Sequence, residues 1–350
     1  MSIKTVLLVS NMYPSESFPH FGSFVRNIEC ELIKEDFKID RVVIDKKYKS
    51  KFEKVVGYVN FYIDVVRNVL FEEYDYIYAH YVSHVSIPLL FCKILKPKLR
   101  IISHVHGGDV KLLSGTSSAF FAIKYNLSKL LLNKSEKVIV PSKYYKDYLS
   151  SNRATNTRST IIYPSGGVDP SIFCYSYKNR ESKLLGYAGR LVRSKNVHLI
   201  LSALRWLPEY KLDIVGEGKE KQKLEKLVSD YNLVDRVTFI PPLDQNSLKI
   251  WYQKVDTLIY PSESESLGLV PLEAIASGVK VVLSNIPAFK EFEERGIEVN
   301  MMVNLGEESI VSCIKNIYLK NDSDLEANSI LVLSLYSSEI VKENLLNAFK

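Results

Sequence analysis

The sequence lacks several features that define whole classes of protein. Its 350 residues contain only four cysteines, with no C-x-x-C spacing, which argues against a disulfide framework and against a zinc-cysteine site. No apolar run reaches the roughly 18 residues of a membrane-spanning helix, and the first residues enter a strand pattern without a signal-peptide cleavage site. The first strand leads into NMYPSES instead of the G-x-G-x-x-G turn of a dinucleotide-binding dehydrogenase. We therefore expect a globular, cytoplasmic protein.

Positive charge is concentrated in the first half of the chain. The sequence carries 46 Lys+Arg against 40 Asp+Glu, a net charge of +6. Residues 1–170 hold 24 basic and 16 acidic residues, and residues 171–350 hold 22 and 24. A basic half suits an anionic membrane surface, a phosphorylated substrate or nucleic acid, and charge alone leaves these three open.

Short β-rich runs alternate with helical patterns along most of the chain. Continuous apolar strands separated by helices are typical of parallel sheets covered on both faces, so the pattern predicts an α/β fold. The runs lie at residues 5–10, 41–44, 76–80, 100–106, 137–140 and 159–163, and again at 184–189, 211–215, 236–240, 257–260 and 279–284.

The chain is long enough for two domains. A stretch rich in glycine, proline and polar residues at 164–183 interrupts the pattern, so we place the boundary near residue 175. The predicted domains are residues 1–174 and 175–332. The last segment, about 333–350, has helical spacing and could pack back on the first domain.

Two carboxylates flank the start of a predicted helix in PSESESLGLVPLEAIASG, residues 261–278. The helix should begin near Leu269, with Glu265 on the loop before it and Glu273 in its first turn. Free N–H groups at a helix start bind phosphate, and Gly268 would let the anion approach the backbone. Glu273 could then bind a ribose diol and Glu265 another polyol. The alternative is a solvated loop and a glutamate that only complements the helix dipole.

Two cations follow the first strand of the second unit in YAGRLVRSKN. Arg190 and Lys195 should emerge at the same sheet edge as the carboxylates, where a guanidinium fork and an ammonium can hold a diphosphate. Arg193 is a competing candidate, and a solvated surface role is the alternative for each.

These motifs together resemble the GT-B nucleotide-sugar glycosyltransferases of the large retaining family four. The matching segments are GRLVRSKN, LDIVGEGKEKQKLEKL, VTFIPPL, YPSESESLGLVPLEAIASG, HVHGGDV and YPSGGVDPSIF. The resemblance implies two Rossmann-like parallel-sheet domains facing across a cleft. The first domain would bind the acceptor and the second a nucleotide sugar, with no metal and no cofactor.

The resemblance also assigns roles to residues of the second domain. Arg190 and Lys195 would bind the donor diphosphate and neutralise the leaving group, and Glu265 would contact the hydroxyls of the donor sugar. Glu273 would bind the ribose. Backbone N–H groups near Leu267, Gly268 and Leu269 would meet the sugar and phosphates.

Three residues of the first domain match family positions. His106 and Asp109 lie in HGGD, where His106 would stand near the donor sugar and reaction centre, and Gly22 matches a first-loop glycine. A core histidine is the alternative for His106. The sequence departs from the family at Ser266 and Leu267, where Gly-Phe is commoner. Gly166 and Lys280 also replace commoner residues. The change at Ser266 and Leu267 bears on the fit of the donor sugar, so the identity of that sugar stays open.

The predicted activity is therefore transfer of a sugar from a UDP- or GDP-sugar, with retention and without a covalent enzyme nucleophile. The acceptor would be a saccharide, expected to be lipid-linked, in assembly of a bacterial surface polysaccharide such as O-antigen, capsule or exopolysaccharide. Lysines that alternate with apolar residues at 46–54 and 120–137 favour peripheral contact with the inner face of the plasma membrane, whereas helices packed into the domain would explain them equally well. Nucleic acid is not expected as a partner.

Three alternatives stay open: a sugar epimerase, a phosphorylase, or a non-catalytic nucleotide-sugar-binding subunit. A D-x-D triplet at 322–324 has the spacing of a metal-binding motif, but its polar setting argues against that role.

Overall fold

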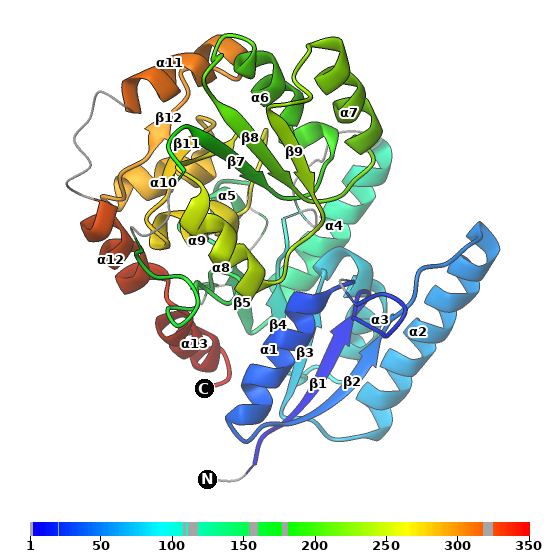
Figure 1. Cartoon of the computed structure of the whole chain (residues 1–350). Helices are drawn as coiled ribbons and strands as arrows, with labels where there is room; N and C mark the ends of the chain where they lie inside the picture. The colour runs from blue at the N-terminus through cyan, green and yellow to red at the C-terminus, as the bar shows by residue number, and fades with distance from the viewer. Residues whose placement is uncertain are drawn as a thin grey trace. The chain divides into compact units, whose positions relative to one another are not determined.

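The computed structural model describes residues 3–19, 21–107, 110, 118–152, 154, 160–176, 181–317 and 325–350 (Figure 1). The chain forms two compact units. The first comprises Met1–Gly166 with Val341–Lys350, and the second comprises Gly167–Ile340. The division thus falls at Gly166, whereas the sequence pattern placed it near residue 175. The triplet at 322–324 lies outside the described residues.

The first unit is a parallel sheet with helices on both faces. Its six strands are arranged in the order β2-β1-β3-β4-β5-β6. The elements are β1 (Thr5–Ser10), α1 (Ser23–Lys34), β2 (Lys38–Val43), α2 (Lys51–Phe71), β3 (Tyr76–His80), α3 (Val82–Leu95), β4 (Ile101–His104), α4 (Ser118–Lys134), β5 (Lys137–Val140), α5 (Lys143–Ser151) and β6 (Thr160–Ile162).

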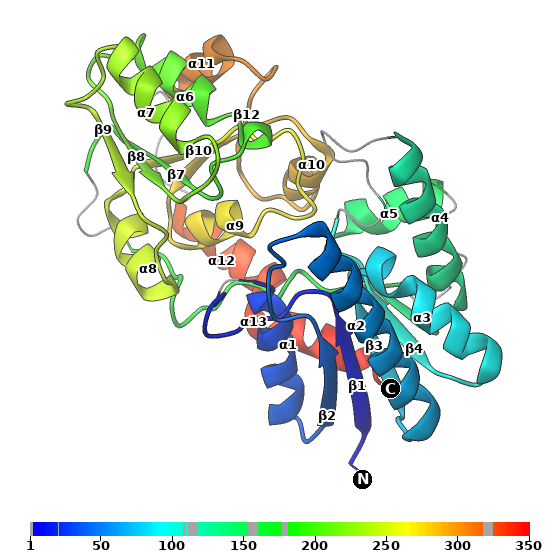
Figure 2. The same ribbon diagram turned by 90° about the vertical axis from the view of Figure 1, so that its right-hand side faces the viewer.

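Helices cover both faces of this sheet (Figure 2), and two large apolar clusters pack its strands against them. One contains Val65 of α2 and Val85 of α3. The other joins Leu32 of α1 and Tyr78 of β3 to Phe349, near the end of the chain. The alternation of side chains along each strand divides them between these two cores.

The second unit contains another parallel six-stranded sheet, in the order β12-β11-β10-β7-β8-β9. Its elements are β7 (Leu184–Ala188), the 3-10 turn η1 (Arg193–Lys195), α6 (Val197–Leu204), β8 (Lys211–Val215), α7 (Lys221–Asp230), β9 (Val237–Ile240), α8 (Gln245–Lys254), β10 (Thr257–Tyr260), α9 (Leu269–Ala276), β11 (Lys280–Leu283), α10 (Pro287–Glu294), β12 (Asn300–Met301), α11 (Glu307–Ile317), α12 (Leu325–Tyr336) and α13 (Ser338–Asn347). The chain changes units within α13.

The predicted α/β class is confirmed, and each of the eleven predicted strands overlaps a strand of the structure. The two-residue strand β12 was missed because it is too short to show periodicity. In the second sheet the first strand, β7, lies next to the fourth, β10. The strand order reverses there, and ligands of doubly wound sheets bind at the carboxyl ends of strands at such a switch point.

The described helices include none that is both long and apolar enough to cross a bilayer.

Candidate functional site

Two loops meet at the switch point of the second sheet. One follows β7 and carries Arg190 to Lys195, and the other follows β10 and leads to Gly268. Hydrogen bonds hold the loops together: the backbone N–H of Glu263 donates to the carbonyl of Ser194 at 2.9 Å, and the amide of Asn196 donates to the carbonyl of Pro261 at 3.1 Å. The sheet order therefore brings together groups that lie about 70 positions apart in the chain.

Lys195 and Glu265 form an ion pair between these loops. Their side chains are 11% and 15% exposed, so water screens the pair only weakly. The Lys195 ammonium also lies 3.3 Å from the Ser262 hydroxyl and 3.4 Å from that of Tyr260. Its Nζ atom is 5.1 Å from the centre of the Tyr260 ring. These contacts fix one positive charge at the carboxyl edge of the sheet.

Stacked tyrosines form the floor beneath the pair. The rings of Tyr187 and Tyr260 are nearly parallel, with centres 5.7 Å apart. Burial and then the charge of Glu265 raise the pKa of both hydroxyls well above the usual value. Both phenols therefore stay neutral, and they provide an apolar floor that strengthens nearby charge interactions.

The two remaining cations of the β7 loop lie in different places. Arg190 lies two residues after the end of β7 and is exposed to solvent, and its carbonyl accepts a hydrogen bond from the Tyr187 hydroxyl at 3.1 Å. Arg193 lines a separate pocket of about 250 Å³ together with His198 and Lys223. Of the two alternatives for the second cation, Arg190 is the one next to the tyrosine floor.

The start of α9 requires glycine at position 268. Gly268 has φ 100°, and a Cβ atom there would lie 2.5 Å from Cε1 of Phe289. Leu267 beside it is buried and Leu269 is partly exposed. The first N–H groups of α9 have no partner within the helix, which is the general basis of anion binding at helix starts.

Glu273 lies in the second turn of α9, not the first. It is the fifth residue of a helix that begins at Leu269, so the expectation of a first-turn carboxylate was wrong. Burial raises the pKa of its carboxyl to about 7. Among the described residues no group hydrogen-bonds this partly exposed carboxyl. A largely buried carboxyl with no hydrogen-bond partner in the described part of the chain is a candidate ligand contact.

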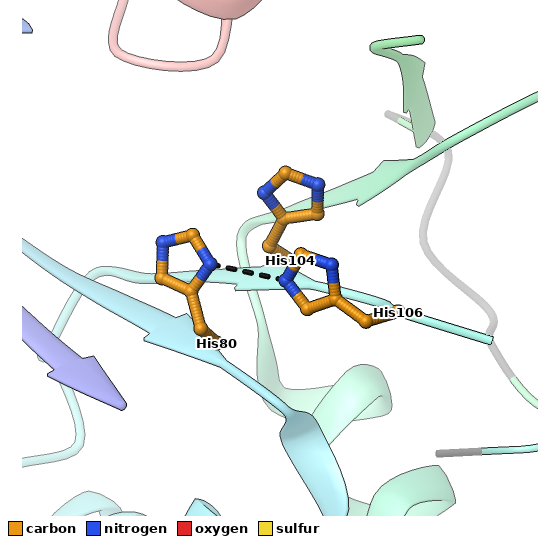
Figure 3. Close-up of side chains that lie close together, drawn as sticks. All are labelled: His80, His104 and His106. Carbon is orange, nitrogen blue, oxygen red and sulfur yellow. Dashed lines mark hydrogen bonds between the residues drawn. The ribbon is translucent and has the colours of Figure 1, made fainter. Parts of the chain in front are cut away.

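Three histidines form a cluster at the carboxyl edge of the first sheet (Figure 3). His80 ends β3, His104 ends β4 opposite it, and His106 lies two residues further on. His80 and His104 are fully buried, whereas His106 is partly exposed. Nδ1 of His80 and Nε2 of His106 are 3.0 Å apart, at hydrogen-bonding distance.

Gly22 is the N-cap residue of α1 and has φ 76°. A Cβ atom there would lie 2.6 Å from the carbonyl oxygen of Met12, so glycine permits a close approach of two backbone segments after β1. Asp109 lies outside the described residues.

Three residues of these clusters were not predicted from the sequence: His80, Tyr260 and Ser262. Two signals were present. His80 ends a strand that was predicted with the correct bounds. Tyr260 ends another such strand, and Ser262 lies two residues beyond it.

Comparisons with known proteins agree with this geometry. Residues 24–172 match the family described as Glycosyltransferase Family 4, and residues 175–311 match Glycosyl transferases group 1. The fold and the matched segments define a glycosyltransferase of the GT-B type. The chain belongs to this family.

Individual relatives share about a quarter to a third of their residues with this chain over the matched segments. The chain is 34% identical over 195 residues to the O-antigen chain mannosyltransferase RfbU of Salmonella typhimurium, and the match spans 55% of this chain and 53% of that protein. An uncharacterized glycosyltransferase of Bacillus subtilis, YqgM, is 26% identical over 251 residues, which cover 69% of this chain and 67% of that protein.

Solved structures share the fold across the whole chain. Sucrose-phosphate synthase from Thermosynechococcus elongatus superimposes with a TM-score of 0.79 at 19% identity, covering 98% of both chains. HepE of Anabaena, solved with UDP and glucose, gives a TM-score of 0.74 at 14% identity, again covering 98% of both chains.

Proposed function

We propose that the chain transfers a hexosyl residue from a UDP- or GDP-sugar to a saccharide acceptor, with retention at the anomeric carbon. The observation that carries the proposal is the Lys195–Glu265 pair at the switch point of the second sheet, beside the start of α9. Arg190 emerges from the same loop as Lys195. Diphosphate and sugar hydroxyls require a positive charge, a glycine at a helix start and an available carboxyl; here the carboxyl is Glu273, which has no hydrogen-bond partner among the residues that the structure describes.

In this proposal the donor lies along the loops of the second unit. Lys195 and Arg190 bind the diphosphate, and N–H groups near Leu267, Gly268 and Leu269 meet the phosphates and the sugar. Glu265 accepts hydrogen bonds from sugar hydroxyls when Lys195 turns from its carboxylate to the phosphate. Glu273 accepts from the ribose hydroxyls.

The chemistry separates charge. The bond between the anomeric carbon and the phosphate oxygen breaks, and its electron pair stays on the diphosphate while the ring gains positive charge. The acceptor oxygen bonds to the same face of the carbon, and its proton passes to the departing phosphate. Arg190 and Lys195 stabilise the negative charge in place, which is the largest contribution that fixed electrostatic groups make to catalysis. The step needs neither a covalent enzyme nucleophile nor a metal ion.

In the first unit, His106 would contact the donor sugar near the reaction centre, with Asp109 as a second contact and Gly22 close to where donor and acceptor meet. The partial exposure of His106, in contrast to its two buried neighbours, supports its role as the member of the cluster that faces a substrate.

The acceptor is proposed to be a lipid-linked saccharide of a bacterial surface polysaccharide. The match to an O-antigen chain mannosyltransferase supports this class. So does α2, which exposes an apolar stripe made of Phe52, Val55, Val59 and Ile63. The lysines at 46, 47, 49, 51 and 54 stand around the start of this helix. Such a helix suits peripheral contact with an anionic bilayer on the cytoplasmic side.

The test is a panel of UDP- and GDP-sugars, with mannosyl donors included, screened by thermal shift and by slow hydrolysis. One donor should raise the melting temperature and release nucleoside diphosphate slowly. Product that forms without any acceptor saccharide would indicate an epimerase, and product that requires free phosphate a phosphorylase. Binding without any turnover, with or without saccharide acceptors, would indicate a non-catalytic subunit.

A further inference from the structure

A pocket of about 450 Å³ opens in the first unit, between α2 and the loop that joins it to β2. β2 is an edge strand of the first sheet, and α2 lies beside it (Figure 1). All residues that line the pocket belong to the first unit, so its lining does not depend on the second unit.

The loop gives the pocket its positive charge. Three lysines line it: Lys46, Lys47 and Lys49. None of them forms an ion pair with a residue that the structure describes, and the Lys46 ammonium lies 5.9 Å from the centre of the Tyr48 ring. The one carboxylate of the lining, Glu53, accepts the backbone N–H of Lys49 at 2.9 Å and so helps to cap α2. Three lysines against one glutamate leave the lining with two excess positive charges, which favours an anion.

Two neutral polar groups also line the pocket. The Tyr48 hydroxyl and the Asn60 amide have no hydrogen-bond partner in the described part of the chain. The Tyr48 ring crosses α2 at Gly57, where a Cβ atom would collide with the tyrosine hydroxyl. Glycine inside a helix costs about 1 kcal/mol relative to alanine, and here it makes room for the tyrosine. Tyr48 is thereby placed against the helix as a wall of the pocket.

The part of the lining that α2 supplies is largely apolar. Phe52 and Val56 line the pocket and are 78% and 41% exposed. Together with Asn60 they are spaced four residues apart, so the three lie along one side of the helix. Phe52 also belongs to the exposed apolar stripe of α2. The pocket therefore offers positive charge and apolar surface side by side, a combination that suits a phosphate group with a hydrocarbon chain.

We propose that this pocket binds the diphosphate and the first isoprenoid unit of a polyprenyl diphosphate, the lipid that carries the acceptor saccharide. The lysines pair with the diphosphate oxygens, and Tyr48 and Asn60 donate hydrogen bonds to them. The first carbons of the lipid lie against Phe52 and Val56, and the rest of its chain follows the stripe of α2 into the bilayer. A diphosphate that joins a lipid to a saccharide carries two negative charges, which match the excess charge of the lining. The choice of a lipid diphosphate rests on the proposed function, in which the acceptor is lipid-linked.

A pocket for one lipid differs from a general attraction to anionic membranes. The general attraction depends on how many lysines the surface carries, whereas the pocket depends on which lysines they are. Lys51 and Lys54 belong to α2 but do not line the pocket. Their removal changes the net charge by the same amount as removal of two pocket lysines, so they provide a matched control.

The test is calorimetric titration of the full-length protein with farnesyl diphosphate, below the concentration at which it forms micelles. One binding site is expected. Lys46→Gln with Lys49→Gln should weaken binding about tenfold or more, because both substitutions remove charge-assisted hydrogen bonds. Lys51→Gln with Lys54→Gln should weaken it less than about twofold, because charges outside the pocket are screened by salt. Tyr48→Phe, which removes one hydroxyl donor, should weaken it about fivefold.

Further titrations identify what the pocket recognises. Inorganic diphosphate and farnesol should each bind about ten times more weakly than farnesyl diphosphate, because one lacks the apolar contacts and the other the charged ones. Saturating UDP or GDP should not compete with farnesyl diphosphate, and Lys195→Ala should bind it as the wild type does, since Lys195 belongs to the second unit.

Equal weakening by the two pairs of lysine substitutions would show a general attraction and overturn the proposal. So would inorganic diphosphate that binds as tightly as the lipid, which indicates a site for free phosphate, or competition by UDP or GDP, which places the probe in the donor site. If farnesyl diphosphate binds as expected but no sugar is transferred from any donor, the proposed function fails and the pocket stands. If sugar is transferred but farnesyl diphosphate does not bind, the pocket assignment fails and the proposed activity stands.

Discussion

The Lys195 ammonium and the Glu265 carboxylate form an ion pair that ties the loop after β7 to the loop after β10. In this pair each group neutralises the other. In the proposed function, donor binding separates the pair: the ammonium moves to the diphosphate, and the carboxylate is released to accept hydrogen bonds from the sugar. The ion pair keeps both charged groups beside the proposed donor site. Neither charge is then left unpaired at a position with little access to water.

Glu273 should make donor affinity depend on pH. Burial raises the pKa of Glu273 to about 7, so its carboxyl is half protonated near neutrality, whereas in the proposed function the ribose hydroxyls bind its ionised form. Affinity for an intact nucleotide sugar, whose diphosphate does not titrate in this range, should rise about tenfold from pH 6 to pH 8. Titration calorimetry measures this.

The control for that prediction is Glu273→Gln, which should bind the same donor more weakly and with little pH dependence. The free energy of unfolding of the wild-type protein without donor should have the opposite pH dependence to donor affinity. A carboxyl whose pKa is raised by folding stabilises the fold at pH values below its pKa in the unfolded chain, about 4.5. This contribution is lost as the pH rises from about 4.5 through 7. Equal pH slopes of donor affinity in the two proteins would exclude Glu273 from the donor site.

The buried histidines should make the first unit sensitive to acid. Burial lowers the pKa of His80, His104 and His106, so the unfolded chain binds more protons than the folded one below about pH 6.5. The free energy of unfolding should therefore fall as pH drops from about 6.5 towards 4, before most carboxylates titrate.

Urea unfolding at a series of pH values measures this loss. His80→Phe should have a shallower slope between pH 6.5 and 5, since it has one histidine fewer to protonate. His198→Gln, at the start of α6, removes a histidine of the second unit whose pKa burial also lowers, so it measures the effect of losing one such histidine outside the cluster. A His80→Phe slope as steep as that of the wild type would mean that the cluster is not the acid-sensitive element.

Gly268→Ala should weaken the second unit and the donor site together. The substitution places a Cβ atom 2.5 Å from Phe289 and also forces alanine to φ 100°. Gly296→Ala is the matched control, because Gly296 also has a positive φ, 81°, but has only a contact at 3.8 Å. The control should lose about 1–2 kcal/mol from the positive φ alone. Gly268→Ala should lose more in urea unfolding, and equal losses would show that the close contact is relieved at no cost.

The strands of both sheets could be predicted from the sequence because each strand has a local sequence signal. Each of the eleven predicted strands is a short β-rich run between turn residues, and five of them, including residues 5–10 and 76–80, match the observed bounds in full. The exception, Asn300–Met301, is a two-residue strand formed only by pairing with its neighbour β11. Pairing between distant segments leaves no periodic trace in the sequence.

The candidate site was predicted less completely, for the same reason. Arg190, Lys195 and Glu265 could be placed at one sheet edge because each follows a recognisable strand. The contact of Lys195 with Ser262 and Tyr260 depends on β7 lying next to β10, which strand runs alone do not specify. Likewise, the place of His80 beside His106 depends on the pairing of β3 with β4, which could not be predicted from the strand runs.

The exposed stripe of α2 should bind anionic membranes. Phe52, Val55, Val59 and Ile63 are 78%, 62%, 50% and 58% exposed and lie on one side of the helix, opposite the buried Phe61 and Val65. Liposomes with anionic lipid should sediment the wild-type protein in a salt-sensitive way. Phe52→Ser with Val59→Ser should reduce this binding, and Val234→Ser, which removes an exposed valine from the second unit, should not. Absence of salt-sensitive binding by the wild type would favour a soluble acceptor.

The central claim is that Arg190 and Lys195 hold the leaving diphosphate. Its most direct test is the rate of sugar transfer at saturating donor for Arg190→Ala and Lys195→Ala, with Lys183→Ala as the control because that lysine pairs with Glu209 at the surface. Loss of a preorganised charge at the leaving group should lower kcat about 100- to 1,000-fold in the first two variants and leave the control unchanged. Near-normal rates for both Arg190→Ala and Lys195→Ala would remove these residues from the site and contradict the account.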